Sequence, residues 1–195
     1  MSIHTKQTII TTSKRLFALN GYEGFSMRIL AKESSVGLSS IYHFFEDKDV
    51  LLKYIFDSTN EELGIKRTTL HLPTTAGQML HDRILFQFQN IEDIVFLLKY
   101  LLHFRRDSLR LESRYLPSKA YLHIQEAIEM GVDTNEFQLE SSDIVQDSKA
   151  ITHAINGFLL EYYPDPPQGA ELQKVVGHIH RFLIKSLTNK EVSMG

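Results

Sequence analysis

Apolar side chains recur at intervals of three and four residues along most of the chain, which is the spacing that one face of an α-helix requires. No convincing stretch alternates apolar and polar residues as a half-buried strand would. The pattern therefore predicts an all-α protein of about nine helices. The predicted helices cover residues 5–20, 27–32, 38–44, 47–66, 76–89, 92–106, 117–130, 143–163 and 168–187.

Residues typical of helix ends separate these segments. Gly21 follows the first helix as a stop, and Ser26 and Asp47 occupy the positions of N-caps. A loop is expected over residues 131–137, and three prolines end the long helix at about residue 163.

The four residues Ser-Ser-Val-Gly at 34–37 interrupt the helical pattern between two short helices. Two short helices joined by a turn of three or four residues form a helix-turn-helix, whose second helix enters the major groove of DNA. Leu38, Ser39 and Ser40 make up the first turn of that second helix. Their short side chains allow a close approach to base edges, and a leucine can pack on a thymine methyl group.

Other residues near this turn suit contact with DNA phosphates. Tyr42 and His43 lie further along the second helix. Ser26 and Lys48 lie at predicted helix starts, where free N–H groups favour an anion. Base-facing residues flanked by phosphate contacts are the arrangement that DNA recognition uses.

Residues 9–51 resemble the N-terminal DNA-binding domain of the TetR family of transcriptional regulators. The residues that carry the resemblance are Ile9, Leu16, Phe17, Gly21, Phe25, Ser26, Arg28, Leu30, Ala31, Lys32, Glu33, Val36, Ile41, Tyr42, His43, Phe44, Phe45, Lys48 and Leu51. The rest of the chain resembles the family in its layout of helices only. The resemblance implies a DNA-binding domain over 1–50, a connecting helix over about 47–66, and a ligand-binding and dimerisation domain over 51–195.

The resemblance also implies roles for individual residues. Leu38, Ser39 and Ser40 would face bases. The phosphate contacts would be Ser26, Arg28, Tyr42, His43 and Lys48. Each also has a plainer interpretation: Tyr42 can cover a small core, Lys48 can be a solvated charge, and Ser26 can be only a cap.

Four positions depart from the family pattern. Ser35 stands where the family usually has glycine, and Gly37 stands where it usually has serine or threonine. A glycine cap costs only a few tenths of a kcal/mol relative to serine or threonine. Leu38 replaces a residue that is commonly polar or basic, and Glu46 replaces one that is commonly neutral or positive. These departures affect the expected operator sequence more than the class of protein.

By the same resemblance, the C-terminal helices would pair with a second copy and enclose a small apolar or aromatic ligand. Small residues at helical spacing allow a close helix partner, and the predicted dimer interface consists of Ala150, Ala154, Gly157, Val175, Ile179 and Phe182. The candidate pocket residues are Phe86, Phe96, Tyr100, His103, Phe104, Tyr121 and Phe158. Both sets have an alternative interpretation as the core of one protomer, where aromatic side chains are usually found.

Charge and composition limit the other possibilities. The net charge is −3, but residues 1–53 carry +2 and the remainder −5, which permits a DNA-binding N-terminus. There is no cysteine, so disulfides and thiolate chemistry are excluded. No apolar run is long enough to span a bilayer and no secretory signal is evident, so we expect a cytoplasmic protein without a membrane partner.

Metal and catalytic sites are not expected. No two of the nine histidines lie three or four residues apart, and His178 and His180 point to opposite sides of a helix. Ser40 and His43 are spaced as a nucleophile and a base on one helix, but no third residue would orient the histidine. The sequence predicts neither an enzyme nor a cofactor.

The sequence therefore predicts a homodimeric repressor that binds a palindromic operator and is released by a ligand. Two alternatives remain open: a DNA-binding regulator without a small-molecule inducer, and a ligand-binding protein of the same fold that has lost DNA binding.

Overall fold

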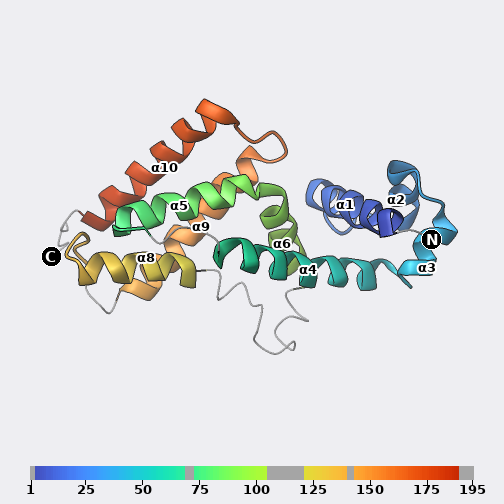
Figure 1. Ribbon diagram of the computed structural model, residues 1–195, viewed down its shortest axis with the longest axis horizontal. Helices are drawn as coiled ribbons and strands as arrows, with labels where there is room; N and C mark the ends of the chain where they lie inside the picture. The colour runs from blue at the N-terminus through green and yellow to red at the C-terminus, as the bar shows by residue number, and fades with distance from the viewer. Residues whose placement is uncertain (1–2, 69–72, 105–120, 140–142, 189–195) are drawn as a thin grey trace. The chain divides into compact units, whose positions relative to one another are not determined.

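The computed structural model describes residues 3–68, 73–104, 121–139 and 143–188, and these residues form nine α-helices and no strand (Figure 1). The all-α prediction is confirmed. The helices are α1 Ile3–Asn20, α2 Met27–Ser34, α3 Leu38–Phe44, α4 Lys48–Thr68, α5 Ala76–Gln89, α6 Ile91–His103, α8 Leu122–Asp133, α9 Ile144–Tyr162 and α10 Gly169–Thr188. Pro117, the predicted start of one helix, lies outside the described residues.

Packing divides the chain into two units. Unit 1 comprises Met1–Leu70 and Glu92–Tyr115, and unit 2 comprises His71–Ile91 and Leu116–Gly195. Helices α4 and α6 therefore pack with α1, α2 and α3, whereas α5, α8, α9 and α10 form the other unit. The domain boundary at residue 50 stays a prediction from the family resemblance.

The predicted helix ends in unit 1 are confirmed by their hydrogen bonds. The Ser26 side chain accepts from the Ile29 N–H at 3.2 Å, and the Asp47 carboxylate accepts from the Val50 N–H at 2.8 Å. Gly21 has a left-handed φ of 68° and donates its N–H to the Phe17 carbonyl at 2.8 Å. Local chemistry thus sets these three boundaries.

Phe17 lies at the centre of unit 1. Its ring is fully buried and makes edge-on contacts with Phe25, at a centroid distance of 6.4 Å, and with Phe96 of α6, at 5.2 Å. Ile41 of α3 and Leu51 of α4 are also fully buried. The helix-turn-helix is therefore built on one core with α4 and α6.

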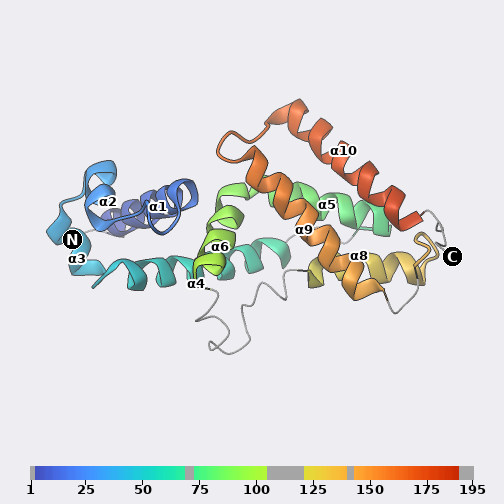
Figure 2. The same cartoon turned by 180° about the vertical axis from the view of Figure 1, so that it is seen from behind.

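In unit 2, α5 lies between α8 and α10, and α9 packs on α8 (Figure 2). Helix α8 runs to Asp133, so the loop predicted over 131–137 begins three residues later. The reason is that the chain turns only at Asn135, which takes a left-handed φ of 58°. Phe137 then folds back, and its N–H donates to the Gly131 carbonyl at 2.9 Å.

Because Phe137 folds back onto α8, position 131 requires a glycine. A Cβ at Gly131 would lie 2.1 Å from a ring carbon of the buried Phe137. We expect Gly131→Ala to lower the free energy of unfolding by about 1–3 kcal/mol, the usual range for overpacking. Gly64→Ala in α4 is the matched control, because a Cβ there meets nothing within 4 Å and should stabilise the helix by up to about 1 kcal/mol. Urea denaturation would measure both, and equal stabilities for the two variants would contradict the expectation.

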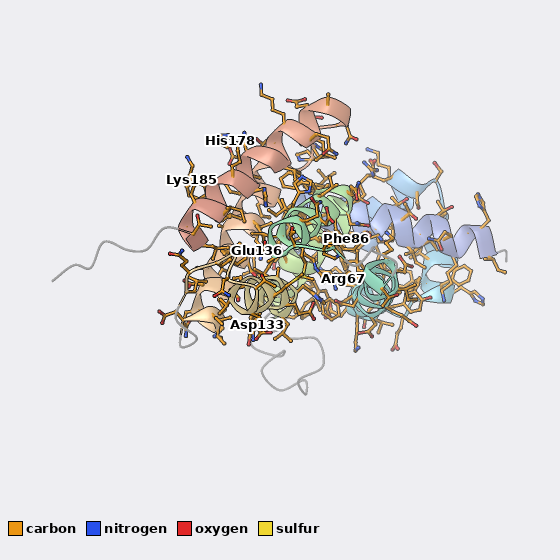
Figure 3. The ribbon with its side chains drawn as sticks, turned by 60° about the vertical axis from the view of Figure 1, so that its left-hand side comes forward. Arg67, Phe86, Asp133, Glu136, His178 and Lys185 are labelled. Atoms are coloured by element: carbon orange, nitrogen blue, oxygen red, sulfur yellow. The ribbon has the colours of Figure 1, made fainter. Side chains whose placement is uncertain are left out.

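Glu136 connects the segment after α8 to the first turn of α5 (Figure 3). Its carboxylate accepts hydrogen bonds from the Ala76 and Gly77 N–H groups, each at 3.1 Å. These N–H groups have no partner within the helix. The bond from Ala76, with those from Gly77 and the Thr134 hydroxyl, holds the pKa of Glu136 below its usual range. The carboxylate therefore stabilises the fold in its ionised form.

This capping predicts a loss of stability in acid. Because the pKa of Glu136 is lower in the folded than in the unfolded chain, its contribution is full above pH 4.5 and is lost as the pH falls through the lowered pKa. We expect Glu136→Gln to cost about 1 kcal/mol at neutral pH and progressively less as the pH falls below 4.5 and through the lowered pKa of Glu136. Urea denaturation over a pH series from neutral into acid measures this, with the exposed Glu161→Gln as control. A cost that stays the same across the whole pH series would rule out the ionised cap.

Candidate nucleic-acid interface

The turn between α2 and α3 is held by its own serines. Ser35 takes a left-handed conformation with φ 55° and ψ 25°, where the family pattern usually has glycine. The Ser34 hydroxyl donates to the Leu30 carbonyl at 2.6 Å and accepts from the Val36 N–H at 3.3 Å. These bonds help to hold a conformation that a side chain disfavours by roughly 1–2 kcal/mol. The turn thus accommodates the Cβ of Ser35.

Helix α3 has a buried and an exposed side. Ile41 is fully buried and Phe45, its C-cap, is also buried. On the other side, Ser39, Tyr42 and His43 are exposed, whereas Leu38 and Ser40 are half-buried. Gly37 is the N-cap and makes no side-chain capping bond. The predicted DNA-facing residues therefore lie together on or beside the exposed side of one short helix.

The predicted phosphate-contacting residues differ in their surroundings. Arg28 and Tyr42 are exposed, and the Tyr42 side chain is 49% accessible. Ser26 is half-buried and already serves as the cap of α2. Lys48 is not a solvated charge: it is half-buried, and its ammonium donates to the Tyr22 and Phe25 carbonyls at 3.3 and 3.4 Å. Its phosphate contact stays a prediction.

Tyr22 was not among the predicted site residues, although it directly follows the helix stop at Gly21. Its ring lies 3.5 Å from the Lys48 ammonium, and its hydroxyl donates to the Asp49 carboxylate at 2.7 Å. The hydrogen bond to Asp49, together with burial, raises the pKa of Tyr22 to about 12. No local pattern indicates these contacts, because Lys48 and Asp49 lie 26 and 27 residues further along the chain.

Four of the seven candidate pocket residues pack inside unit 1. Phe96 contacts Phe17, and Tyr100 stacks on Phe56 at a centroid distance of 4.4 Å. His103 and Phe104 both contact the Tyr22 ring. Burial raises the pKa of Tyr100 to about 12. Phe96 and Tyr100 are thus part of the core, whereas Phe104 is half-buried and His103 is exposed; a ligand role for the four residues stays a prediction.

The other three pocket candidates lie in unit 2, where Phe86 is buried and Tyr121 and Phe158 are half-buried. Their pocket role is likewise a prediction.

The predicted dimer residues are partly exposed on α9 and α10. Ala150 and Gly157 are exposed on α9, and a Cβ at Gly157 would meet nothing within 4 Å. Phe182 on α10 is 62% exposed. Ala154 and Val175 are half-buried, whereas Ile179 is only 2% exposed and serves the core of its own protomer. Packing within one protomer therefore explains neither the glycine at 157 nor the phenylalanine at 182.

Two further features concern other kinds of site. Within the described ranges, no group of three His, Cys, Asp or Glu residues is arranged to hold a metal ion. None of the helices described is both long enough and apolar enough to cross a membrane.

Known proteins share this sequence pattern. Residues 9–55 match the model of the tetR family of bacterial regulatory proteins. Over 86 residues, the chain is 35% identical to the HTH-type transcriptional regulator YhgD of Bacillus subtilis (strain 168). That match covers 44% of this chain and 45% of YhgD, so it spans less than half of the relative.

Solved structures share the fold. A putative TetR-family transcriptional regulator from Rhodococcus sp. matches with a TM-score of 0.69 and 16% identity, over 95% of this chain and 100% of that one. The TetR-family regulator PfmR from Thermus thermophilus gives 0.69 and 20%, over 91% and 97%. FadR from Bacillus subtilis, in complex with stearoyl-CoA, gives 0.67 and 18%, over 93% and 99%. The family model, the relative and the shared fold agree: residues 9–55 match the tetR family of bacterial regulatory proteins, and the chain shares its fold with solved TetR-family regulators.

Proposed function

We propose that the protein is a homodimeric transcriptional repressor that binds a palindromic operator and is released by a small ligand. The observation that carries the DNA-binding part is the exposed side of α3, where Ser39, Tyr42 and His43 face solvent while Ile41 anchors the helix. A recognition helix needs this division between a buried anchor and an exposed reading face.

The residues of α3 support a particular kind of base contact. Its sequence, Leu-Ser-Ser-Ile-Tyr-His-Phe, contains none of the Arg, Lys, Asn or Gln side chains that make bidentate contacts with guanine or adenine. Serine hydroxyls accept or donate to any base, and Leu38 fits a thymine methyl group. Phosphate contacts from Arg28 and Tyr42 would then supply much of the affinity.

Dimerisation follows from the need to read two half-sites. Two recognition helices about one DNA turn apart match a palindrome with two-fold symmetry. The exposed Phe182 on α10, with Ala150 and Gly157 on α9, supports an interface in which α9 and α10 of one copy pack against the same two helices of the other.

The ligand is proposed to be small and apolar or aromatic. The middle helices contain many aromatic side chains, which supports a ligand of this kind. FadR, which has the same fold, was solved with stearoyl-CoA. Such a ligand would release DNA only to the extent that it binds more tightly to the state that does not fit the operator.

The test is selection of bound fragments from sheared genomic DNA of the source organism at about 0.15 M salt, which suppresses weak nonspecific contacts. We expect an enriched palindrome with the wild-type protein and none with Arg28→Ala/Tyr42→Ala, whose exposed side chains are not needed for folding. Arg181→Ala on α10 removes an exposed cation from unit 2 and should bind as the wild type does. No enrichment with the wild-type protein would exclude the proposal and favour a fold that has lost DNA binding.

A further inference from the structure

The Tyr22 ring is held on both faces. The Lys48 ammonium lies 3.5 Å from its centroid, and the His103 imidazole stacks on it at 3.7 Å with an interplanar angle of 13°. Two groups this close to one centroid would overlap on the same face, so they occupy opposite faces. The Phe104 ring meets Tyr22 edge-on at 5.5 Å, and Asp49 binds its hydroxyl. Tyr22 therefore links the last residue of α6 to the first residue of α4.

The surroundings of Lys48 account for its whole hydrogen-bonding capacity. An ammonium group has three N–H donors and no acceptor. Lys48 directs its donors at the Tyr22 carbonyl, the Phe25 carbonyl and the face of the Tyr22 ring. All three acceptors belong to the connection between α1 and α2. A phosphate could therefore recruit Lys48 only by replacing one of them.

Helix α6 is attached along α1 as well as at Tyr22. At its start, the Asp93 carboxylate pairs with Lys14 at 2.6 Å. In its middle, Phe96 packs on Phe17, and the Lys99 ammonium donates to the carbonyls of Ala18 and Leu19, which end α1. The last turn of α6 is thus in contact with the end of α1 through Lys99 and with the Tyr22 ring through His103.

We propose that Tyr22 is a positioning residue through which α6 restrains the DNA contact of Lys48. With His103 stacked on its far face, the ring holds the ammonium on the α1–α2 connection. Lys48 reaches a phosphate when the ring moves away. This inference rests on the proposed operator binding. It adds that α6, while its His103 is stacked on Tyr22, weakens the contact between Lys48 and a DNA phosphate.

The test measures operator affinity against salt concentration, by fluorescence anisotropy, using the DNA selected above. The slope of log K against log salt reports the number of phosphate contacts, at about 0.9 per contact. We expect Tyr22→Leu to bind roughly two- to fivefold more tightly per half-site, the size of an exposed cation–π contact. Its slope should steepen by about 0.9 per half-site, because Lys48 gains a phosphate.

Three controls separate positioning from general damage to the fold. Tyr22→Phe keeps the ring and loses only the bond to Asp49, so it should match the wild-type slope. Lys48→Met and the double variant Tyr22→Leu/Lys48→Met should have equal slopes, because the effect of the ring acts through the ammonium. His103→Ala changes an exposed side chain and should shift affinity and slope in the same direction as Tyr22→Leu. This variant keeps the inference testable if Tyr22→Leu does not fold.

An independent readout is the proton chemical shift of the Lys48 ε-methylene group, which the ring current should move upfield in the wild type and in Tyr22→Phe but not in Tyr22→Leu. An unchanged or shallower salt slope in Tyr22→Leu and His103→Ala, with a wild-type protein that binds DNA, would overturn this inference alone. A wild-type protein with no salt-dependent DNA binding would overturn the proposed function and this inference with it.

Discussion

Replacing Phe182 with glutamate is expected to prevent the proposed dimer from forming and to weaken the proposed operator binding by at least about a hundredfold. Phe182 is 62% exposed on α10, so its ring is available to a partner. Burying a phenylalanine contributes about 1.5–3 kcal/mol, and a two-fold interface repeats the contact. A glutamate at this position would also have to lose its hydration in the interface, which adds to the cost.

Sedimentation velocity at micromolar concentration measures the change, and anisotropy with operator DNA measures its consequence. Ile65→Glu is the matched control, because Ile65 is 61% exposed on α4 in the other unit. A second variant, Gly157→Leu, tests the α9 side of the same interface. A Cβ at this position meets nothing within 4 Å in the protomer, so the leucine should clash only with a partner helix and should also weaken the dimer. A wild-type monomer, or a Phe182→Glu dimer, would contradict the proposed interface.

The second large effect concerns stability. Phe17→Ala is expected to lower the free energy of unfolding by about 3–5 kcal/mol, the usual cost of truncating a buried aromatic side chain. Phe17 is fully inaccessible and touches both Phe25 and Phe96, so its loss leaves a cavity shared by three segments of unit 1. Since native domains are stable by only about 5–15 kcal/mol, the variant should lie close to the limit of folding.

Chemical denaturation followed by circular dichroism measures this loss. Phe25→Leu is a milder comparison, because leucine retains much of the buried apolar volume and should cost about 1–1.5 kcal/mol. Leu19→Ala is the exposed control on the same helix and should change stability by less than about 0.5 kcal/mol. A Phe17→Ala variant as stable as the wild type would show that this region can repack around the missing ring.

Local chemistry explains the parts of the fold that the sequence predicted. The side chains of Ser26 and Asp47 cap the helices that follow them by binding an N–H only three residues away. The bounds of α5 equal the predicted range for the same reason, because the Thr75 side chain accepts from the Gln78 N–H at 3.1 Å. The bounds of α3 also equal the predicted range, although its N-cap Gly37 has no side chain to cap it. The predicted end of α8 was three residues too early, because a glycine such as Gly131 often ends a helix. In the structure Gly131 lies within the helix, and its missing side chain leaves room for the ring of Phe137.

The same distinction applies to the candidate interface. Periodicity alone places Ile41 in the core and leaves Ser39, Tyr42 and His43 outside, because residues of one helix share a face at fixed spacing. It cannot reveal that Lys48 is held by Tyr22, or that His103 lies on the other side of that ring. These residues are separated by 26 and 81 positions, and a pattern within a window of one helix carries no information across such distances.

The helical class, most helix ends and the helix-turn-helix can therefore be predicted from the sequence, because each depends on periodicity or on capping within a few residues. Which distant polar groups bind one another becomes visible only when the helices are packed. Glu136 caps α5 from 60 residues away, and Lys99 binds the end of α1 from 81 residues away. Such partners meet only when helices pack, because a buried or terminal polar group takes whichever complementary group the fold brings within hydrogen-bonding distance.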